Sequence, residues 1–348
     1  MTAGPARTFT TSPIANEKMT VRESINSAMS DEIERDETVF LIGEEVAQYN
    51  GAYKVSKGMW DRYGDKRIWD TPITEAGFTG IAVGAGLNGL RPVVEFMTWN
   101  FALQAIDHII NSTAKTLYMS GGELSCPIVF RGINGVSASV GAQHTQCFAS
   151  WYSQVPGLKV VSPWSVEDCR GLMKAAIRDN DPIVFLENEM MYNQEFDVTP
   201  EIMGKDFLIP IGKAKIERAG TDCTITAHAK MVGHSLAAAE ILQRDHGVSV
   251  EVINLRTIKP LDRNTIIDSV KKTKRIVSVE EGWPQSGVGA EIAAVMMESE
   301  AFDYLDAPME RIAGAEVPMP YSWAIEGMAV PQIENIVNGV LAATFRQK

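Results

Sequence analysis

Short β-rich runs alternate with helical segments along most of the chain, and this alternation is the feature that most restricts its fold. Strands that follow one another through helices form parallel sheets covered on both faces. The alternation stops at residues 191–212, which include Pro200, Pro210 and two glycines, and then resumes. We therefore predict the α/β class, with two three-layer parallel-sheet domains at 19–190 and 213–348 joined by a linker at 191–212.

Apolar periodicity and capping residues predict the individual elements. A capping box at Thr20 and Glu23 opens the first helix, and Ser165 caps a later one. In the first half we expect strands at 39–42, 91–97, 128–131, 158–162 and 183–186, helices at 20–35, 75–87, 99–119 and 165–178, and a surface loop at 47–70. In the second half we expect strands at 223–227, 248–255, 275–279 and 311–313, and helices at 232–244, 261–273, 288–302 and 332–345.

Composition excludes several classes of protein. The 348 residues carry a net charge of −12, which argues against a nucleic-acid partner. The four cysteines have no CxxC spacing, so neither a disulfide framework nor a zinc site is expected. No apolar run is long enough to span a membrane. Residues 1–18 contain Arg7 and no acid before Glu17, which is typical either of a transit-peptide remnant or of a disordered tail.

The sequence Thr-Pro-Ile-Thr-Glu-Ala-Gly-Phe-Thr-Gly at 71–80 places Glu75 at the head of an apolar, glycine-rich helix. Thr74 is a suitable N-cap, and Pro72 ends the preceding segment. The carboxylate either caps its own helix, where the dipole favours negative charge, or serves a function. A buried carboxylate needs a partner, and no local residue supplies one.

The other motifs are weaker on their own. Gly84-Ala-Gly-Leu-Asn-Gly89 matches the dinucleotide pattern, but its glycines fall late in a helix, so close packing explains them better. Gly287-Val-Gly289 precedes a helix and could hold a phosphate, although it lacks a P-loop lysine. His144 lies in an irregular stretch at the carboxyl end of a strand, where α/β ligand sites form, and is equally consistent with a structural histidine. Phe101, Gln104 and Asp107 share a face of the helix expected at 99–119, and their spacing alone favours core and rim positions over a cofactor site.

Many segments, in order, resemble one family. They include TPITEAGFTGIAVGAGLNGLRPVVEFMTWNF, YMSGGE, PIVFRGINGVSASVGAQHTQCFASWYSQVPGLKVVSPW, IRDNDPIVFLENE, INLRTIKPLD and AGAEVPMPY. These resemble the beta subunits of the pyruvate dehydrogenase component of 2-oxoacid dehydrogenase complexes, from about Met19 to Lys348. The EFMTWNF and AQHTQCF segments favour pyruvate over branched-chain substrates. The branched-chain beta subunit remains an alternative, as does a non-catalytic assembly subunit.

The resemblance implies a fold, a cofactor and roles for single residues. The fold is a pyrimidine-binding domain followed by a transketolase C-terminal domain, and the cofactor is thiamine diphosphate. Glu75 would hydrogen-bond the ring nitrogen of the aminopyrimidine, Phe101 would pack against that ring, and Gln104 would join them in cofactor binding. His144 would position, and could protonate, the lipoyl group as the acyl unit transfers.

The resemblance also implies partners and metals. Thiamine diphosphate enzymes hold the diphosphate through magnesium with a GDG segment, and this chain has none. The family places that half of the site on an alpha subunit in an α2β2 heterotetramer, so we expect this chain to be inactive alone. A dihydrolipoyl acetyltransferase core with its lipoyl domain would be the further partner, in the mitochondrial matrix. The family also binds potassium, largely through backbone carbonyls, at positions matching Ile128, Ala176, Ile177, Asp179 and Asp181.

Overall fold

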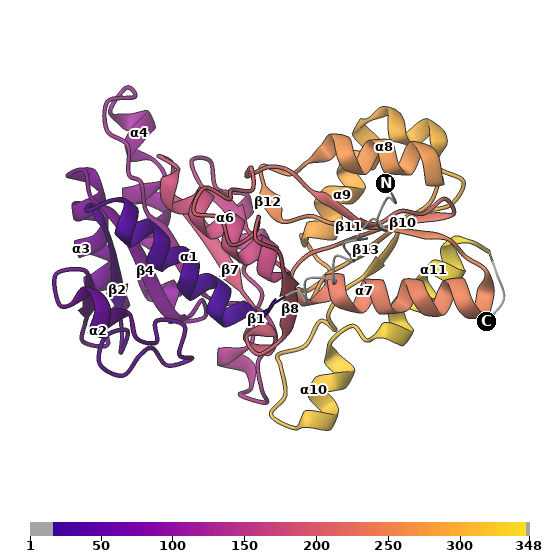
Figure 1. Cartoon of the computed structure of the whole chain (residues 1–348). Helices are drawn as coiled ribbons and strands as arrows, with labels where there is room; N and C mark the ends of the chain where they lie inside the picture. Colours follow the sequence, from indigo (N-terminus) through magenta and orange to yellow (C-terminus); the bar gives the residue numbers. More distant parts are fainter. Residues whose placement is uncertain (1–16, 346–348) are drawn as a thin grey trace, which may run out of the picture.

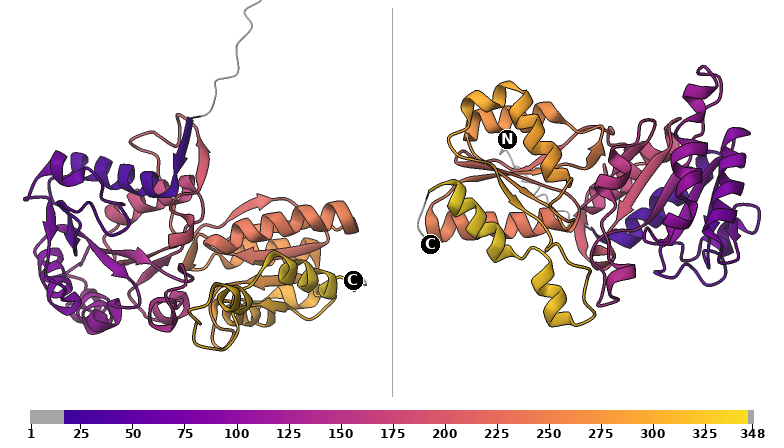
Figure 2. Two further views of the ribbon diagram at one scale, coloured as in Figure 1. Left: turned by 90° about the horizontal axis from the view of Figure 1, so that it is seen from below. Right: turned by 180° about the vertical axis from the view of Figure 1, so that it is seen from behind.

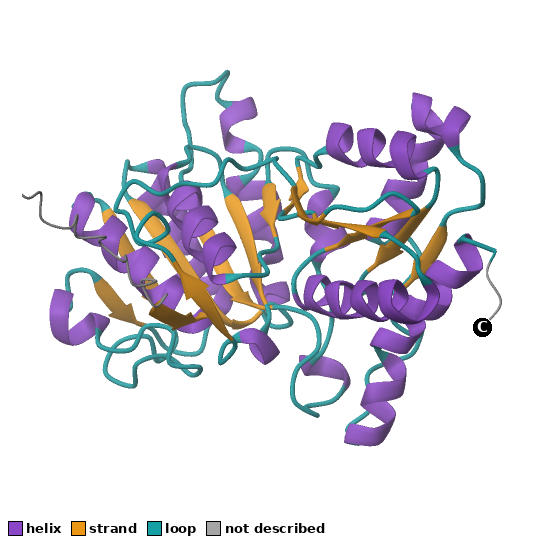
Figure 3. Cartoon of the chain, turned by 45° about the vertical axis from the view of Figure 1, so that its right-hand side comes forward, coloured by secondary structure: helices purple, strands orange, loops and turns teal. Residues whose placement is uncertain are grey.

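The computed structural model describes residues 17–345, and it folds into two α/β domains that lie side by side (Figure 1). The predicted tail therefore falls almost entirely outside the described residues. Helices cover both faces of each sheet, as Figure 3 shows by secondary structure. The predicted three-layer α/β architecture is confirmed.

The first domain is built on a seven-stranded sheet of order β12-β6-β7-β5-β4-β2-β3. Every neighbouring pair is parallel except β12 with β6. The strands are β2 (Val39–Gly43), β3 (Ile68–Asp70), β4 (Arg91–Thr98), β5 (Val129–Ile133), β6 (Lys159–Val161), β7 (Ile183–Glu187) and β12 (Thr257–Lys259).

Helices α1 (Val21–Arg35) and α6 (Val166–Arg178) pack together on one face of this sheet. Both predicted caps are present, because Thr20 and Ser165 each form a capping box with the acid three residues on. The other face is covered by α3 (Glu75–Leu87), the 3₁₀ helix η1 (Ala102–Ala105), the π-helix η2 (His108–Thr113) and α5 (Ala149–Ser153).

The second domain is built on a five-stranded sheet of order β14-β13-β10-β11-β9 in which only β9 is antiparallel. The strands are β9 (Lys215–Arg218), β10 (Cys223–Ala227), β11 (Val250–Asn254), β13 (Ile276–Val279) and β14 (Glu310–Ile312). The helices are α7 (Lys230–Ile241), which continues as the π-helix η5 (Leu242–His246), α8 (Arg263–Thr273), α9 (Val288–Glu298), the 3₁₀ helix η6 (Glu300–Tyr304), α10 (Trp323–Ala329) and α11 (Ile333–Ala343).

Two predictions about elements are wrong. The single helix expected at 99–119 is instead η1, η2 and the short α4 (Thr116–Met119). The loop expected at 47–70 contains α2 (Met59–Tyr63) and β3. The segment expected as a linker, 191–212, contains the short strand β8 (Glu195–Val198), which pairs with the N-terminal strand β1 (Glu17–Thr20). The 3₁₀ helix η4 (Glu189–Met191) ends at the first residue of this segment.

The two domains share structure across their boundary. Strand β12 belongs to the second half of the sequence and adds an edge to the first sheet. One hydrophobic cluster contains Phe40 and Phe130 from the first domain together with Ile253 and Ile292 from the second. The views in Figure 2 show the halves in contact along one side, with α10 projecting from the second. The relative position of the domains is therefore set by packing and by backbone pairing.

Candidate active site

The candidate site lies at the carboxyl edge of the first sheet. Glu44 follows β2, Thr71 follows β3, Phe101 follows β4, and His144 lies in the segment after β5. These four strands are neighbours in the sheet, so the residues that follow them gather at one edge. This is the edge at which open α/β sheets bind ligands.

Two carboxylates at this edge are buried and incompletely partnered. Glu75 is 5% exposed and Glu44 is 6% exposed. Oε2 of Glu75 and Oε1 of Glu44 have no hydrogen-bond partner, and neither do the buried hydroxyls of Thr71 and Thr79. Native proteins leave few buried polar atoms unsatisfied, because each costs about 1–3 kcal/mol. The cluster therefore fits a ligand that supplies hydrogen-bonding atoms of its own.

The two carboxylates also interact electrostatically. Burial, and secondarily the negative charge of Glu75, raises the pKa of Glu44 to about 7. At neutral pH Glu44 therefore exchanges a proton readily, which is the property required of an acid–base group. Glu44 has no sequence motif of its own, and its position one residue after a buried strand was the only available signal.

The sequence of α3 explains how Glu75 is held. Phe78 and Ala82 lie in the core, so this side of α3 packs against the sheet. Thr74 occupies the N-cap position, but its side chain makes no capping hydrogen bond, so the expected cap is present in position only. Glu75 begins the helix, where the dipole stabilises its charge. The glycines of the dinucleotide-like pattern lie late in α3 or just after it, as expected.

Phe101 and His144 are brought together. Their rings meet edge to face, with centroids 5.0 Å apart and an interplanar angle of 89°. His144 ends the short 3₁₀ helix η3 (Ala142–His144) and is exposed. Phe101 is the N-cap residue of η1, and η1 packs against α3, so the aromatic pair and Glu75 belong to one region. Gln104 is exposed on η1, and its backbone N–H donates to Phe101 O at 3.1 Å.

A buried ion network supports the strands beneath this edge. Arg131 on β5 contacts Glu187 on β7 through Nε and Nη2, each at 2.6 Å, and pairs with Glu95 on β4. The Tyr192 hydroxyl donates to Glu187 at 2.6 Å. Burial works against the charge of Arg131, but the two carboxylates outweigh it and hold its pKa above the usual value. The network joins three of the central strands below the site.

The residues matched to a potassium site converge at the amino end of β5 and β7. The carbonyl of Ile128 accepts from Ile183 N at 2.9 Å. The carbonyls of Ile177 and Asp179 both accept from Arg91 Nη1, at 3.0 and 2.9 Å. The Asp179 and Asp181 carboxylates pair with Lys159 at 2.6 and 3.0 Å.

The remaining motifs serve structure. The backbone N–H groups of Val288 and Gly289 at the start of α9 donate to the Glu280 carboxylate, at 3.0 and 2.8 Å. The amides that could have held a phosphate therefore bind a carboxylate of the chain itself. Within residues 17–345, no group of three or more His, Cys, Asp and Glu side chains is arranged for a metal ion.

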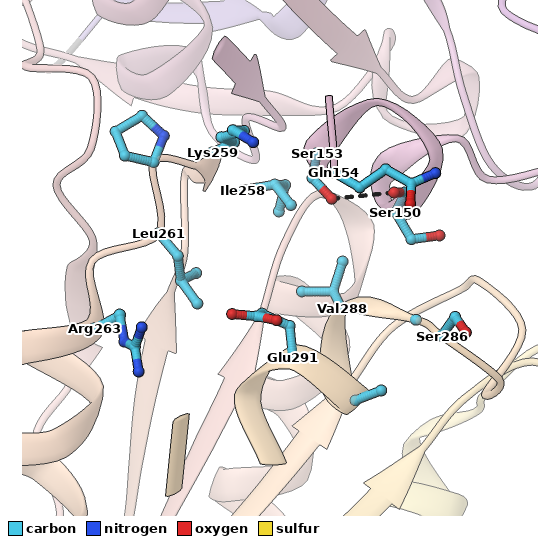
Figure 4. A pocket seen from close by; sticks show the side chains of 13 residues that line it. Ser150, Ser153, Gln154, Ile258, Lys259, Leu261, Arg263, Ser286, Val288 and Glu291 are labelled. Atoms are coloured by element: carbon cyan, nitrogen blue, oxygen red, sulfur yellow. Dashed lines mark hydrogen bonds between the residues drawn. The ribbon is translucent and has the colours of Figure 1, made fainter. Parts of the chain in front are cut away.

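A separate hollow of about 680 Å³ lies between α5 and the second domain (Figure 4). Lys259, Arg263 and Glu291 line it together with Ser150 and Gln154, so charges of both signs face one space. None of the predicted site residues lines this hollow. The candidate active site is therefore the cluster of partly unsatisfied residues around Glu75, not this hollow.

Comparison with known proteins identifies both domains. Residues 17–195 match the model of the transketolase pyrimidine-binding domain, and residues 212–336 match that of the transketolase C-terminal domain. A solved chain described as a split gene transketolase, inactive beta4 tetramer, covers 95% of this chain and 99% of its own length. Its TM-score is 0.75 at 20% identity, which shows the fold.

Closer relatives narrow the family. A protein of Oryza sativa subsp. japonica named pyruvate dehydrogenase E1 component subunit beta-1, mitochondrial, is 62% identical over 99% of this chain and 91% of its own length. The subunit beta of Bos taurus is 64% identical over 92% of this chain and 89% of its own length, and that of Homo sapiens is 62% identical over the same shares. The chain belongs to the pyruvate dehydrogenase E1 beta subunits.

Membership of the E1 beta family bears out the main functional prediction over the branched-chain alternative, because these relatives carry the pyruvate name. The predicted mitochondrial location is confirmed in the same way, since their names include it. Within residues 17–345, no helix has the length and apolar character needed to cross a membrane.

Proposed function

We propose that this E1 beta subunit supplies the pyrimidine half of a thiamine diphosphate site in pyruvate dehydrogenase (acetyl-transferring). The observation that carries the proposal is the buried carboxylate of Glu75 with an unpartnered oxygen, beside Glu44. An aminopyrimidine offers an amino group, which can donate to a carboxylate oxygen, and ring nitrogens, which can accept from a protonated carboxyl or a hydroxyl. The unpartnered carboxyl and hydroxyl oxygens at this site can take both roles. Bound thiamine diphosphate supplies the electron sink for decarboxylation of a 2-oxoacid.

The residues of this chain have distinct roles in the proposal. Glu75 holds a proton at the pyrimidine ring nitrogen, where its place in a largely water-free site strengthens the hydrogen bond. Phe101 presents an aromatic face beside the same ligand, and Gln104 lies at the exposed rim. His144, held edge to face by Phe101, orients the lipoyl group of the dihydrolipoyl acetyltransferase at the mouth and is placed to hold a proton there. The product is an acetylated lipoyl group, which feeds acetyl-CoA formation in the mitochondrial matrix.

The proposed assembly is an α2β2 heterotetramer in which the alpha subunit holds magnesium and the diphosphate. The outer face of α3 supports this arrangement. Ile73, just before α3, is 83% exposed and Ile81 is 58% exposed. A Cβ built on Gly84 meets no atom of the described chain within 4 Å. Apolar side chains and open glycines on the helix that carries Glu75 are typical of a surface covered by another subunit.

Thiamine diphosphate binding measured by calorimetry in magnesium buffer tests the shared site. We expect tight binding to the mixture of alpha and beta chains and none to this chain alone. Tight binding to this chain alone would mean that it holds a diphosphate site of its own. In the tetramer, Glu75→Gln should lower pyruvate oxidation by roughly 100-fold, because it removes an acid–base group. Retention of full activity would favour the alternative of a non-catalytic assembly subunit.

Potassium is proposed at the carbonyls of Ile128, Ala176, Ile177, Asp179 and Asp181. The donor type fits, since hard cations take oxygen ligands and the last carbonyls of a helix, here α6, carry partial negative charge. Arg91 and Lys159 already neutralise part of this region, but each carbonyl retains a second lone pair. We expect the melting temperature to be a few degrees higher in potassium chloride than in sodium or choline chloride at equal ionic strength. Equal melting temperatures would contradict the proposal.

A further inference from the structure

We propose that Glu281 and Glu326, two carboxylates of the second domain, are positioning residues for His144 in the first domain. They hold the segment 134–146, called here the His144 loop, in the conformation that presents the histidine. This inference rests on the proposed function, because it assigns His144 to the step that acetylates the lipoyl group. It adds that the second domain controls that step through two side chains.

Glu281 holds the beginning of the loop. It follows β13, and its Oε2 accepts from the backbone N–H of Val136 at 3.2 Å and from Asn188 Nδ2 at 3.1 Å. Gly135 has a φ of +83°, and a Cβ at this position would clash with the same Glu281 oxygen. The loop therefore approaches the carboxylate more closely than any residue with a side chain would allow.

Glu326 holds the middle of the loop. It lies on α10, is 3% exposed, and its Oε2 accepts from the backbone N–H of Ser139 at 3.1 Å. The ring of Tyr321, just before α10, stands against Gly141, which has a φ of +80° and no room for a Cβ. Gly141 immediately precedes η3, the turn that ends in His144. Glu326 on α10 and Tyr321 just before α10 therefore contact the loop on the two sides of Val140.

Charge in the second domain supports both contacts. Lys230 at the start of α7 lies 3.5 Å from Glu281, and its positive charge also acts on Glu326. Burial raises the pKa of both carboxyls above its ordinary value, and the loop amides and Lys230 offset only part of that rise. A buried carboxylate that accepts from a backbone amide makes one of the stronger hydrogen bonds in proteins. The side chains are thus held firmly enough to position a loop.

The first domain supplies the remaining supports of the loop. Ser137 Oγ donates to Glu189, Gln146 Nε2 donates to Asn100 Oδ1 at 3.1 Å, and Gly135 N donates to Gln146 O at 2.9 Å. These contacts close the ends of the loop, while Ser139 has its carboxylate partner on α10. Loss of Glu326 should therefore displace the segment near His144 and leave Glu75 undisturbed.

The test compares two reactions of the assembled tetramer. Pyruvate oxidation with ferricyanide as acceptor requires no lipoyl group, whereas acetylation of a lipoyl domain, followed by mass spectrometry, requires His144. We expect Glu326→Ala to lower kcat/KM for the lipoyl domain about tenfold, the effect of one lost charged hydrogen bond, and to leave ferricyanide reduction within twofold. Glu326→Gln retains an acceptor oxygen and should restore most of the activity. The matched control is Glu316→Ala, which removes an exposed glutamate from the segment that leads into α10.

Equal losses in both reactions would overturn the proposal, because they would indicate a general loosening of the fold. Full activity of Glu326→Ala in lipoyl acetylation would also overturn it. Tyr321→Ala, which removes an exposed ring, gives an independent measurement if Glu326→Ala fails to assemble, and the same selective loss is expected. His144→Ala separates this inference from the proposed function. If His144→Ala leaves lipoyl acetylation intact, the role of His144 is wrong; if it abolishes acetylation while the Glu326 and Tyr321 variants do not affect it, only the positioning role is wrong.

Discussion

At the scale of single residues, Glu44 is the group whose chemistry departs most from its ordinary form. A glutamate in water has a pKa of ~4.3, whereas burial and the charge of Glu75 raise that of Glu44 to about 7. Between these values the folded chain binds a proton that the unfolded chain has released. The contribution of Glu44 to stability is therefore fully present below about pH 4.3 and is lost as the pH rises through about 7.

This linkage predicts the effect of Glu44→Gln. Glutamine has the shape of glutamate but does not titrate. The free energy of unfolding of the variant should therefore rise by about 1–3 kcal/mol relative to that of the parent chain between pH 4.5 and 8. Urea unfolding of the purified chain across this pH range measures the difference. Glu45→Gln, at the neighbouring exposed position, is the control and should leave the pH dependence unchanged. A parent and a Glu44→Gln variant with parallel pH profiles would show that Glu44 titrates normally.

Single residues also show how far the site could be predicted from sequence. Glu75 was found because a carboxylate among apolar neighbours within one helix is a local anomaly. Glu44 was missed because Gly43-Glu44-Glu45 looks like an ordinary exposed turn. Glu44 is buried, and the charge that acts on it comes from Glu75, which is distant in sequence. Phe101 and His144 were predicted separately, and their ring contact depends on the order of β4 and β5 in the sheet.

At the scale of elements, predictions were best where a helix end carries its own hydrogen bonds. The caps at Thr20 and Ser165 are encoded within four residues, so α1 and α6 begin where expected. The helix expected at 99–119 had the correct apolar spacing but the wrong geometry. Hydroxyls there bond to nearby carbonyls, with Thr113 Oγ1 donating to His108 O at 2.7 Å, and such bonds compete with regular helix. Periodicity identifies a helical face, but it does not separate α from 3₁₀ and π geometry.

Elements that depend on distant pairing were not predictable in the same way. Strand β12 is three residues long and joins the sheet of the other domain, and β8 pairs with β1 at the start of the described chain. Neither has a local hydrophobic pattern long enough to identify a strand. The first pairing joins the two domains, and the second joins the start of the described chain to the segment between the domains. The sequence therefore predicts the two domains better than it predicts how they are joined.

At the scale of the whole molecule, the fold leaves the helix that carries Glu75 uncovered on one side. Its inner face, with Phe78 and Ala82, fills the core, while Ile81 on the outer face is 58% exposed and Gly84 is open. A carboxylate with an unsatisfied oxygen and an apolar face thus lie on one helix. In an α2β2 assembly a single contact would complete the cofactor site and cover this surface, so binding of the alpha subunit and formation of the site should be coupled.

Ile81→Asp tests this coupling. The substitution places a charge on a solvated surface of the free chain, so its unfolding should change by less than about 1 kcal/mol. In the assembly it would bury that charge, and we expect association with the alpha subunit to weaken on the order of tenfold or more. Analytical ultracentrifugation of the mixed chains measures the tetramer fraction, and calorimetry measures thiamine diphosphate binding. The tetramer fraction and the cofactor affinity should fall together. Leu208→Asp, at an exposed apolar residue of the segment that connects the domains, should alter neither quantity. If the Ile81→Asp chain assembles normally, the alpha subunit binds elsewhere, and this face of α3 has no part in completing the cofactor site.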